Sequence, residues 1–227
     1  IFFYYDNAEN IKVGNLVFWP QFTNSVELGY KTNLTKGYYY AAIYHRSTNG
    51  TITRIATQAP PSTLIYTVFQ NAGYSSNTGV EMVFQQNFSK AFSFNSNVNI
   101  YRNIINAFTV ENKYPVLSIY TAGKEAITSG NVKLNGIFHL PKKTDVQLTA
   151  IYLAPDIIPQ GRIDTRFSVD MGIKKQIQKD KGELFFNASD IFNTLRIKKT
   201  VTGNGFTLAS TDYYETQVIR LGYSYKF

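Results

Sequence analysis

The sequence predicts an all-β fold, an antiparallel transmembrane β-barrel to which the chain contributes about nine strands. Three observations predict it: side chains alternate between apolar and polar over long segments, the composition favours strands and turns, and short connections alternate with long ones. The last segment alternates most clearly, since Ile219, Leu221, Tyr223, Tyr225 and Phe227 share one face. A period of two residues is typical of a strand with different surroundings on its two faces.

The composition fits strands and excludes several classes of protein. Among 227 residues there are 17 tyrosines, 17 phenylalanines and one tryptophan. Aromatic residues favour strands, and abundant asparagine, threonine and serine favour turns. No stretch approaches the roughly 18 apolar residues of a transmembrane helix. Because the chain has no cysteine, disulfides and thiolate metal sites are excluded.

The net charge of +8 does not point to nucleic acid, because lysine and arginine are spread singly along alternating segments. The first residues, IFFYYDNAEN, carry acidic groups where a signal peptide has basic ones. We therefore expect that a signal was removed or that the chain is part of a longer protein.

Alternation and turn residues divide the chain into strands. Residues 1–21 are expected to be an irregular extracellular loop and lead-in segment, and residues 22–227 the C-terminal part of a barrel. A bulge is expected at 71–73. The nine predicted strands cover about residues 22–34, 38–57, 66–88, 91–108, 126–140, 144–154, 163–177, 182–199 and 211–227.

The connections differ in length in a regular way. Those after the first, third, fifth and seventh strands are tight and contain lysine, whereas the others are longer. Outer-membrane barrels have short periplasmic turns and long extracellular loops. We therefore expect extracellular loops at 58–65, 109–125, 155–162 and 200–210, with Phe227 at the periplasmic end. A soluble β-sandwich, the alternative fold, gives no reason for this regularity.

An odd number of strands places the two ends of the segment on opposite sides of the membrane. Single-chain bacterial barrels have even numbers of strands, with both termini in the periplasm. Further strands are therefore expected before Ile1.

Three segments carry a family resemblance. They are VGNLVFWPQFTNSVELGY from Val13, FNASDIFNT from Phe186, and RLGYSYKF at the end of the chain. Their order resembles the TonB-dependent receptors, and within them most closely the Bacteroidota-type outer membrane beta-barrel subgroup. Leu16 and the step Trp19-Pro20-Gln21 depart from the first motif.

The resemblance implies an energised importer of the bacterial outer membrane. The chain would form roughly the last two fifths of a barrel of about 22 strands. The solute would be a siderophore, a glycan, a peptide or another large molecule. Implied partners are outer-membrane lipid, the upstream strands and plug domain, TonB through a segment outside this chain, and the barrel-assembly machinery. The tyrosine, asparagine and threonine of the predicted loops suit either a polar solute or a surface lipoprotein. Phe227, with Tyr225, Tyr223 and Leu221, would form the barrel-assembly signal.

No arrangement of residues indicates catalysis or a cofactor. The two histidines, His45 and His139, lie on different predicted strands, and neither has the spacing of a metal ligand or of a catalytic base. We expect a protein that is not an enzyme and has no catalytic residue, no metal and no cofactor.

Charged residues on the polar faces of two strands are candidate lumen contacts. Asp164, Arg166, Asp170 and Lys174 share one face of the seventh predicted strand, and Arg220 lies on the last. They are expected either to line a solute path or to contact a plug. The alternative is a hydrated wall whose charges neutralise one another.

The DIFN segment is interpreted as structural. It comprises Asp190, Ile191, Phe192 and Asn193, with Asn187 just before it. Aspartate and asparagine side chains bond to nearby backbone and suit the ends of strands. A role as ligands is the alternative.

The predicted function is therefore solute uptake through a TonB-dependent barrel. The alternative, from a different class, is a structural or interaction subunit of a larger outer-membrane assembly, including a barrel captured during membrane insertion. A barrel with its own plug would favour the importer.

Overall fold

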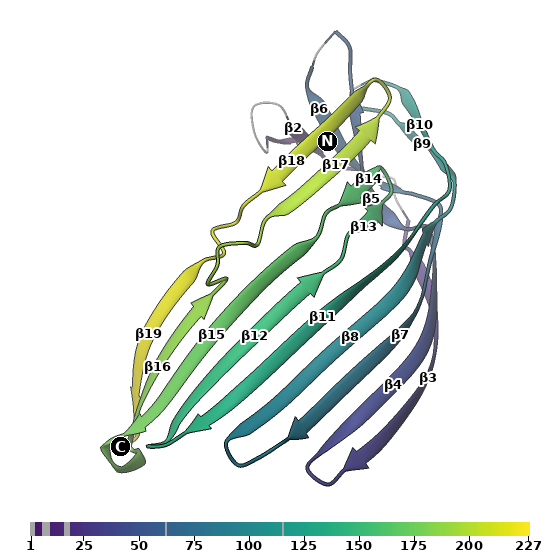
Figure 1. The fold of residues 1–227 in the computed structure, drawn as a ribbon. Coiled ribbons are helices and arrows are strands. Elements are labelled where there is room, and N and C mark those ends of the chain that lie inside the picture. Colours follow the sequence, from purple (N-terminus) through teal and green to yellow (C-terminus); the bar gives the residue numbers. More distant parts are fainter. Residues whose placement is uncertain (1–2, 6–9, 16–18, 62, 115) are drawn as a thin grey trace.

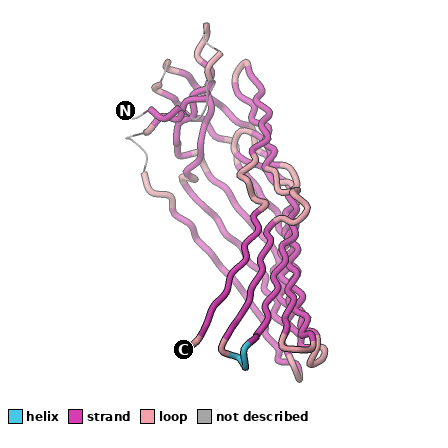
Figure 2. The backbone as a smooth tube through the Cα atoms, turned by 90° about the vertical axis from the view of Figure 1, so that its left-hand side faces the viewer, coloured by secondary structure: helices cyan, strands magenta, loops and turns pink. Residues whose placement is uncertain are grey.

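The main body of the protein is a nine-stranded antiparallel sheet that forms a curved wall (Figures 1 and 2). The computed structural model describes residues 3–5, 10–15, 19–61, 63–114 and 116–227. The strand order across the wall is β19-β16-β15-β12-β11-β8-β7-β4-β3. The strands are β3 (Phe22–Leu34), β4 (Gly37–Asn49), β7 (Tyr74–Asn87), β8 (Phe92–Ile105), β11 (Glu125–Leu140), β12 (Thr144–Leu153), β15 (Arg166–Ile177), β16 (Gly182–Ser189) and β19 (Val218–Tyr225).

The prediction of about nine antiparallel strands is confirmed. Each wall strand pairs with its predecessor in the wall, so the sheet is a meander of hairpins. The wall does not close, because β3 and β19 form its two edges and each pairs on one side only within the described residues.

Tight turns join the strands at one end of the wall, which we call the turn end. They cover residues 35–36, 88–91, 141–143 and 178–181, the last including a 3-10 turn, Gln178–Asp180. Two neighbouring turns are joined by an ion pair between Lys143 and Asp180. The C-terminus also lies at this end (Figure 1).

Long connections join the strands at the opposite end, which we call the loop end. They cover residues 50–73, 106–124, 154–165 and 190–217, and each contains a hairpin of its own. The hairpins are β5 (Ile52–Gln58) with β6 (Ile65–Asn71), β9 (Phe108–Asn112) with β10 (Ser118–Ala122), β13 (Asp156–Ile158) with β14 (Gly161–Ile163), and β17 (Ile197–Gly203) with β18 (Phe206–Asp212).

These hairpins assemble into small sheets beyond the wall. One has the order β1-β2-β6-β5, with β1 (Phe3–Tyr5) and β2 (Asn10–Val13), and its β2–β6 pair is parallel. Another has the order β13-β14-β17-β18. The segment 1–21, predicted to be irregular, thus contains two strands. Leu16 of the resemblance motif lies outside the described residues.

Several predicted strands were too long, because the hairpins continue the alternation of the wall. The predicted strand 38–57 breaks at Gly50, whose φ is 65°, and 66–88 breaks at Gly73, whose φ is 50°. The predicted strand 182–199 is interrupted by the DIFN segment, and the last strand begins at Val218 rather than at Thr211. The predicted bulge at 71–73 is instead the break between β6 and β7.

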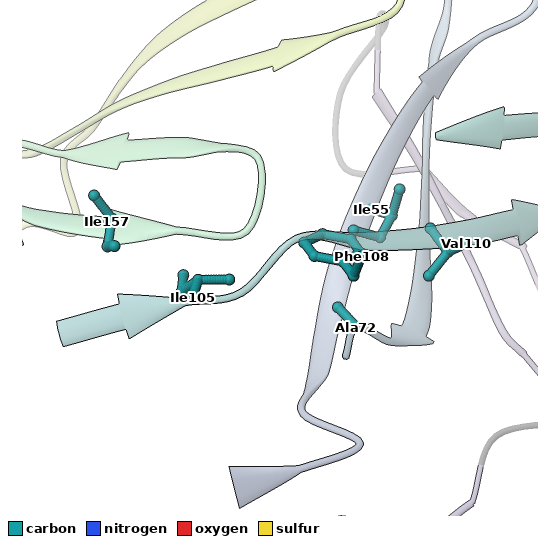
Figure 3. Close-up of a cluster of buried hydrophobic side chains, with 6 residues drawn as sticks. All are labelled: Ile55, Ala72, Ile105, Phe108, Val110 and Ile157. Atoms are coloured by element: carbon teal, nitrogen blue, oxygen red, sulfur yellow. The ribbon is translucent and has the colours of Figure 1, made fainter. Parts of the chain in front are cut away.

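The buried hydrophobic residues lie at the loop end. One cluster contains Ile55, Ala72, Ile105, Phe108, Val110 and Ile157, which come from three connections and the end of β8 (Figure 3). A second contains Ile11, Val13 and Val68. A single hairpin is only marginally stable in water, whereas fully burying an aliphatic or aromatic side chain contributes about 1.5–3 kcal/mol. The hairpins β5–β6, β9–β10 and β13–β14 therefore hold their positions by sharing a core.

Candidate functional site: the polar face of the wall

The wall has an apolar face and a polar face. On the apolar face, Leu28, Ile43, Val80 and Ile100 stand opposite one another across β3, β4, β7 and β8. Toward the opposite edge of the sheet, the same apolar face carries the row Val146, Ile173, Phe186 and Leu221 across β12, β15, β16 and β19. The register therefore keeps one apolar surface continuous from edge to edge.

Charge on the apolar face is confined to its two ends. Among the aspartate, glutamate, lysine and arginine residues of the nine wall strands, only Arg102, near the loop end, and Lys175, near the turn end, lie on this face. On β11, residues 130–140 extend from just beyond the row of Arg102 to the row of Lys175, and they cover roughly 33 Å along the strand. A tilt of about 40° gives an apolar band roughly 25 Å tall, the height that spans an outer membrane.

The polar face carries the remaining charges of the wall. They are Glu27, Lys31, Arg46, Glu81, Glu125, Lys133, Asp145, Arg166, Asp170, Lys174, Glu183 and Arg220. Several are paired locally. Lys174 Nζ lies 2.8 Å from Glu183 Oε2, and Asn97 donates to Glu81 across 2.9 Å. Such a surface requires water or another polar surface against it.

A hollow of about 380 Å³ opens in the polar face near the loop end. Tyr44 and Tyr101 line it together with Arg46 and asparagine side chains. The Tyr44 hydroxyl donates to Asn99 Oδ1 at 3.0 Å, and the Arg46 guanidinium lies 4.6 Å from the centre of the Tyr44 ring. Amides, hydroxyls and ring faces at one place can bind a polar solute or a polar protein surface.

The 154–165 connection, at the loop end, folds over this polar face. The carboxylate of Asp156, in β13, accepts hydrogen bonds from the Tyr101 hydroxyl at 2.7 Å and from Asn103 Nδ2 at 2.8 Å. Tyr101 and Asn103 both lie on the polar face of β8, and Ile157 packs in the same cluster as Ile105 on that face. The 154–165 connection therefore covers the wall's polar side rather than extending straight outwards.

The candidate lumen contacts do not form one cluster. Arg166, Asp170 and Lys174 follow one another along the polar face of β15, and Arg220 lies on the polar face of β19. Lys174 is paired with Glu183, and Asp170 accepts from the backbone N–H of Asp190 at 2.8 Å. Asp164 is not on this strand, because the chain leaves β14 at Ile163 and β15 begins at Arg166. Its backbone N–H instead donates to the carbonyl of Lys198.

Asp190 of the DIFN segment is almost completely buried, with 1% of its surface exposed. Its Oδ1 accepts hydrogen bonds from the backbone N–H and the hydroxyl of Thr194, at 2.9 and 3.3 Å. Its Oδ2 accepts from the Leu195 N–H at 3.0 Å and from the Thr216 hydroxyl at 2.7 Å. The carboxylate thus joins the beginning and the end of the 190–217 connection.

The other members of this segment support the same turn. Ile191 N–H donates to the Val169 carbonyl at 2.8 Å, and Asn193 N–H donates to the Asp190 carbonyl at 2.7 Å. Asp190 and Asn193 have positive φ angles of 45° and 52°, which aspartate and asparagine tolerate better than most residues. Asn187 stands opposite Arg220 on the polar face, and Phe192 is exposed.

The hydrogen bonds to Asp190 also set its protonation. Burial of the carboxylate alone raises its pKa, but donation from Thr216, Thr194 and Leu195 favours the charged form more strongly. The pKa of Asp190, which lies beyond the end of β16, is therefore below its ordinary value.

Leu221, Tyr223 and Tyr225 of the proposed assembly signal lie on the apolar face of the edge strand β19, and Phe227 follows the end of that strand. Leu221 is 79% exposed, and Tyr223, Tyr225 and Phe227 are exposed as well. The Tyr225 and Phe227 rings meet edge to face with centroids 5.5 Å apart, and Tyr223 donates to Gln178 Oε1 at 2.6 Å. The aromatic end of the chain is therefore open to lipid or to another protein.

Gln160 and Asn112 are buried polar residues whose importance the sequence reasoning missed. Gln160 Oε1 accepts from the Ala56 N–H at 2.6 Å, and its Nε2 donates to the Ala56 carbonyl at 2.9 Å. One side chain thus pairs with the edge strand β5 as a neighbouring strand would. Asn112, fully buried, joins Gln70 to Thr57. The turn Pro159-Gln160-Gly161 was the available signal for Gln160.

The described residues contain no group of three or more histidine, cysteine, aspartate or glutamate side chains arranged to hold a metal ion. Nδ1 of His45 is hydrogen-bonded to the hydroxyl of Thr78, and Nδ1 of His139 lies 2.7 Å from Oδ1 of Asp145. No helix in the described part of the chain is long and apolar enough to cross a membrane.

Strands with one apolar and one polar face, joined by tight turns at one end and long connections at the other, define the wall of an outer-membrane β-barrel. Comparison with protein families agrees with this class. The chain matches the Outer membrane protein beta-barrel family over residues 1–225 and belongs to that family. It is a protein of the bacterial outer membrane, as its sequence predicts. Comparison with curated proteins gives no significant match.

Proposed function

We propose that this chain forms part of the barrel of a TonB-dependent receptor that imports a large polar solute of the siderophore, glycan or peptide class. The observation that carries the proposal is the fold of the 154–165 connection over the polar face, through the bonds of Asp156 to Tyr101 and Asn103. A barrel opening that hairpins narrow at the loop end, next to a hydrated polar face, suits selective uptake of a solute. The chain's contribution is binding and passage of the solute, without catalysis.

The open edges of the wall support a larger barrel. β3 and β19 each present a row of backbone groups with no partner strand among the described residues. Unpaired backbone groups are costly in a bilayer. In the proposal, upstream strands complete a barrel of about 22 strands around a plug. TonB acts through a segment outside this chain, and a surface lipoprotein cooperates at the loop end.

The length of the native protein is the first test. Intact-mass measurement of the protein extracted in detergent should give a value far above the 25.8 kDa of this chain. A mass near that of the chain would refute the importer and favour an assembly subunit completed by other proteins.

Uptake is the second test. A deletion strain should lose growth on one member of a panel of three nutrients. The panel contains a ferric siderophore as the sole source of iron, an oligosaccharide as the sole source of carbon and an oligopeptide as the sole source of nitrogen. Loss of TonB should abolish growth on the same member. Unchanged growth on the whole panel, together with loss of other outer-membrane proteins from the membrane, would overturn the proposal.

A further inference from the structure

Arg102 occupies an unusual place in the wall. It lies on the apolar face of β8, where it stands opposite Thr78 of β7 and Thr128 of β11. The next residue in this row is His45 of β4. All four side chains are exposed. The row marks the upper limit of the apolar band at the loop end, the side that faces outwards in outer-membrane barrels.

An apolar groove of about 580 Å³ lies beside this row. Val26, Leu28, Ile43, Val80 and Ile100 line its apolar part, and each of them is at least 40% exposed. His45, Thr78, Arg102 and Thr128 line its polar part. The groove therefore combines an apolar channel with a cationic end.

The nine wall strands, all of them fully described, place no carboxylate on this face. Arg102 Nη1 donates to the Thr128 hydroxyl at 3.2 Å, which uses one of the five N–H groups of a guanidinium. The other charged residue among aspartate, glutamate, lysine and arginine on the apolar face of the nine strands is Lys175, also a cation, near the turn end. The wall strands therefore supply no counter-anion at Arg102, and the surrounding membrane is a source of one.

We propose that this groove binds a phosphorylated lipid of the outer leaflet. An acyl chain lies along Ile43, Val80 and Ile100, and the phosphate receives hydrogen bonds from Arg102. A guanidinium matches a phosphate with two parallel bonds, and such charge-assisted bonds are the stronger kind. The inference rests on the barrel wall and not on transport. The simpler possibility is that Arg102 extends its head group into interfacial water.

The test uses the full-length protein, purified from the outer membrane and freed of native lipid in detergent. Binding of phosphorylated lipid A is measured by titration with native mass spectrometry. Arg102→Gln should bind it at least about tenfold more weakly than the wild type, since it loses charge-assisted bonds. Lipid A with its phosphates removed should bind the wild type and Arg102→Gln equally weakly.

Two variants serve as matched controls. Arg46→Gln removes a cation at a similar height on the opposite face, and Lys175→Gln removes the cation at the other end of the same face. Both should bind lipid A as the wild type does. Equal binding of phosphorylated and dephosphorylated lipid to the wild type, full binding by Arg102→Gln, or equal weakening by Lys175→Gln would overturn the proposal. The comparison of the two lipids decides the matter even if Arg102→Gln fails to fold.

Discussion

The hydroxyl of Thr216 donates a hydrogen bond of 2.7 Å to the buried carboxylate of Asp190, 26 residues earlier in the chain. Asp190 directly follows β16, and Thr216 lies just before β19. The two strands are neighbours in the wall. The bond therefore closes the base of the 190–217 connection where the chain leaves and re-enters the wall.

Replacing Asp190 by alanine should open this connection. The change leaves the N–H groups of Thr194 and Leu195 and the Thr216 hydroxyl without their acceptor, at a cost of about 3 kcal/mol. The free energy for local opening of the 190–217 connection should fall by that amount, so the open form becomes about a hundredfold more populated. Trypsin should then cleave after the exposed Lys198 about a hundredfold faster. Asp180→Ala, which alters an exposed ion pair at the turn end, should not change the rate. Equal cleavage of both variants would refute this role.

Acid should weaken the same closure. Because the pKa of Asp190 is lowered in the folded protein, its contribution to stability is complete above the ordinary aspartate pKa of about 3.9. It is lost as the pH falls through the lowered value. Hydrogen exchange of residues 190–217, corrected for intrinsic rates, should increase in that range in the wild type. In Asp190→Asn the exchange should be fast already at pH 7. A wild-type profile that stays flat down to pH 2 would contradict the linkage.

Gly222, in the last strand, lies close to the ring of Phe185. A Cβ added at Gly222 would overlap the ring of Phe185 on the neighbouring strand β16. Gly222→Val should therefore destabilise the β16–β19 pair by about 1–3 kcal/mol through overpacking. The fraction of heat-modifiable, folded barrel on a semi-native gel should fall.

A second substitution tests whether the ring is the cause. Phe185→Ala combined with Gly222→Val should recover most of the folded fraction, because the overlap disappears. Ser224→Val, on the same face of β19 where Ser224 is exposed, is the matched control and should fold normally. No recovery in the double variant would show that Gly222 is needed for another reason.

The wall could be predicted from the sequence, because each wall strand has different surroundings on its two faces and therefore alternates. The hairpins at the loop end could not be separated from it. The alternation continues from β4 into β5 through Gly50, where only the positive φ turns the chain. The same is true at Gly73, between β6 and β7.

Side-chain partners were harder to predict than strands. The preference of aspartate for strand ends indicated that Asp190 shapes a turn, but nothing local identified Thr216 as its partner. The pairing of Gln160 with the backbone of Ala56 joins residues 104 positions apart. Such contacts depend on how separate connections pack over the polar face, which alternation does not encode.

The assignment of the two faces can be tested with single cysteines, since the chain contains none. Gln147 and Leu148 are adjacent in β12 and both exposed, on the polar and the apolar face respectively. An environment-sensitive fluorophore attached at Leu148→Cys should lose more than half of its intensity in liposomes of brominated lipid. The same fluorophore at Gln147→Cys should lose little, because successive side chains of a strand point to opposite faces. Strong quenching at Gln147→Cys, or the reverse order, would mean that lipid does not contact the face on which the apolar band and the groove beside Arg102 lie.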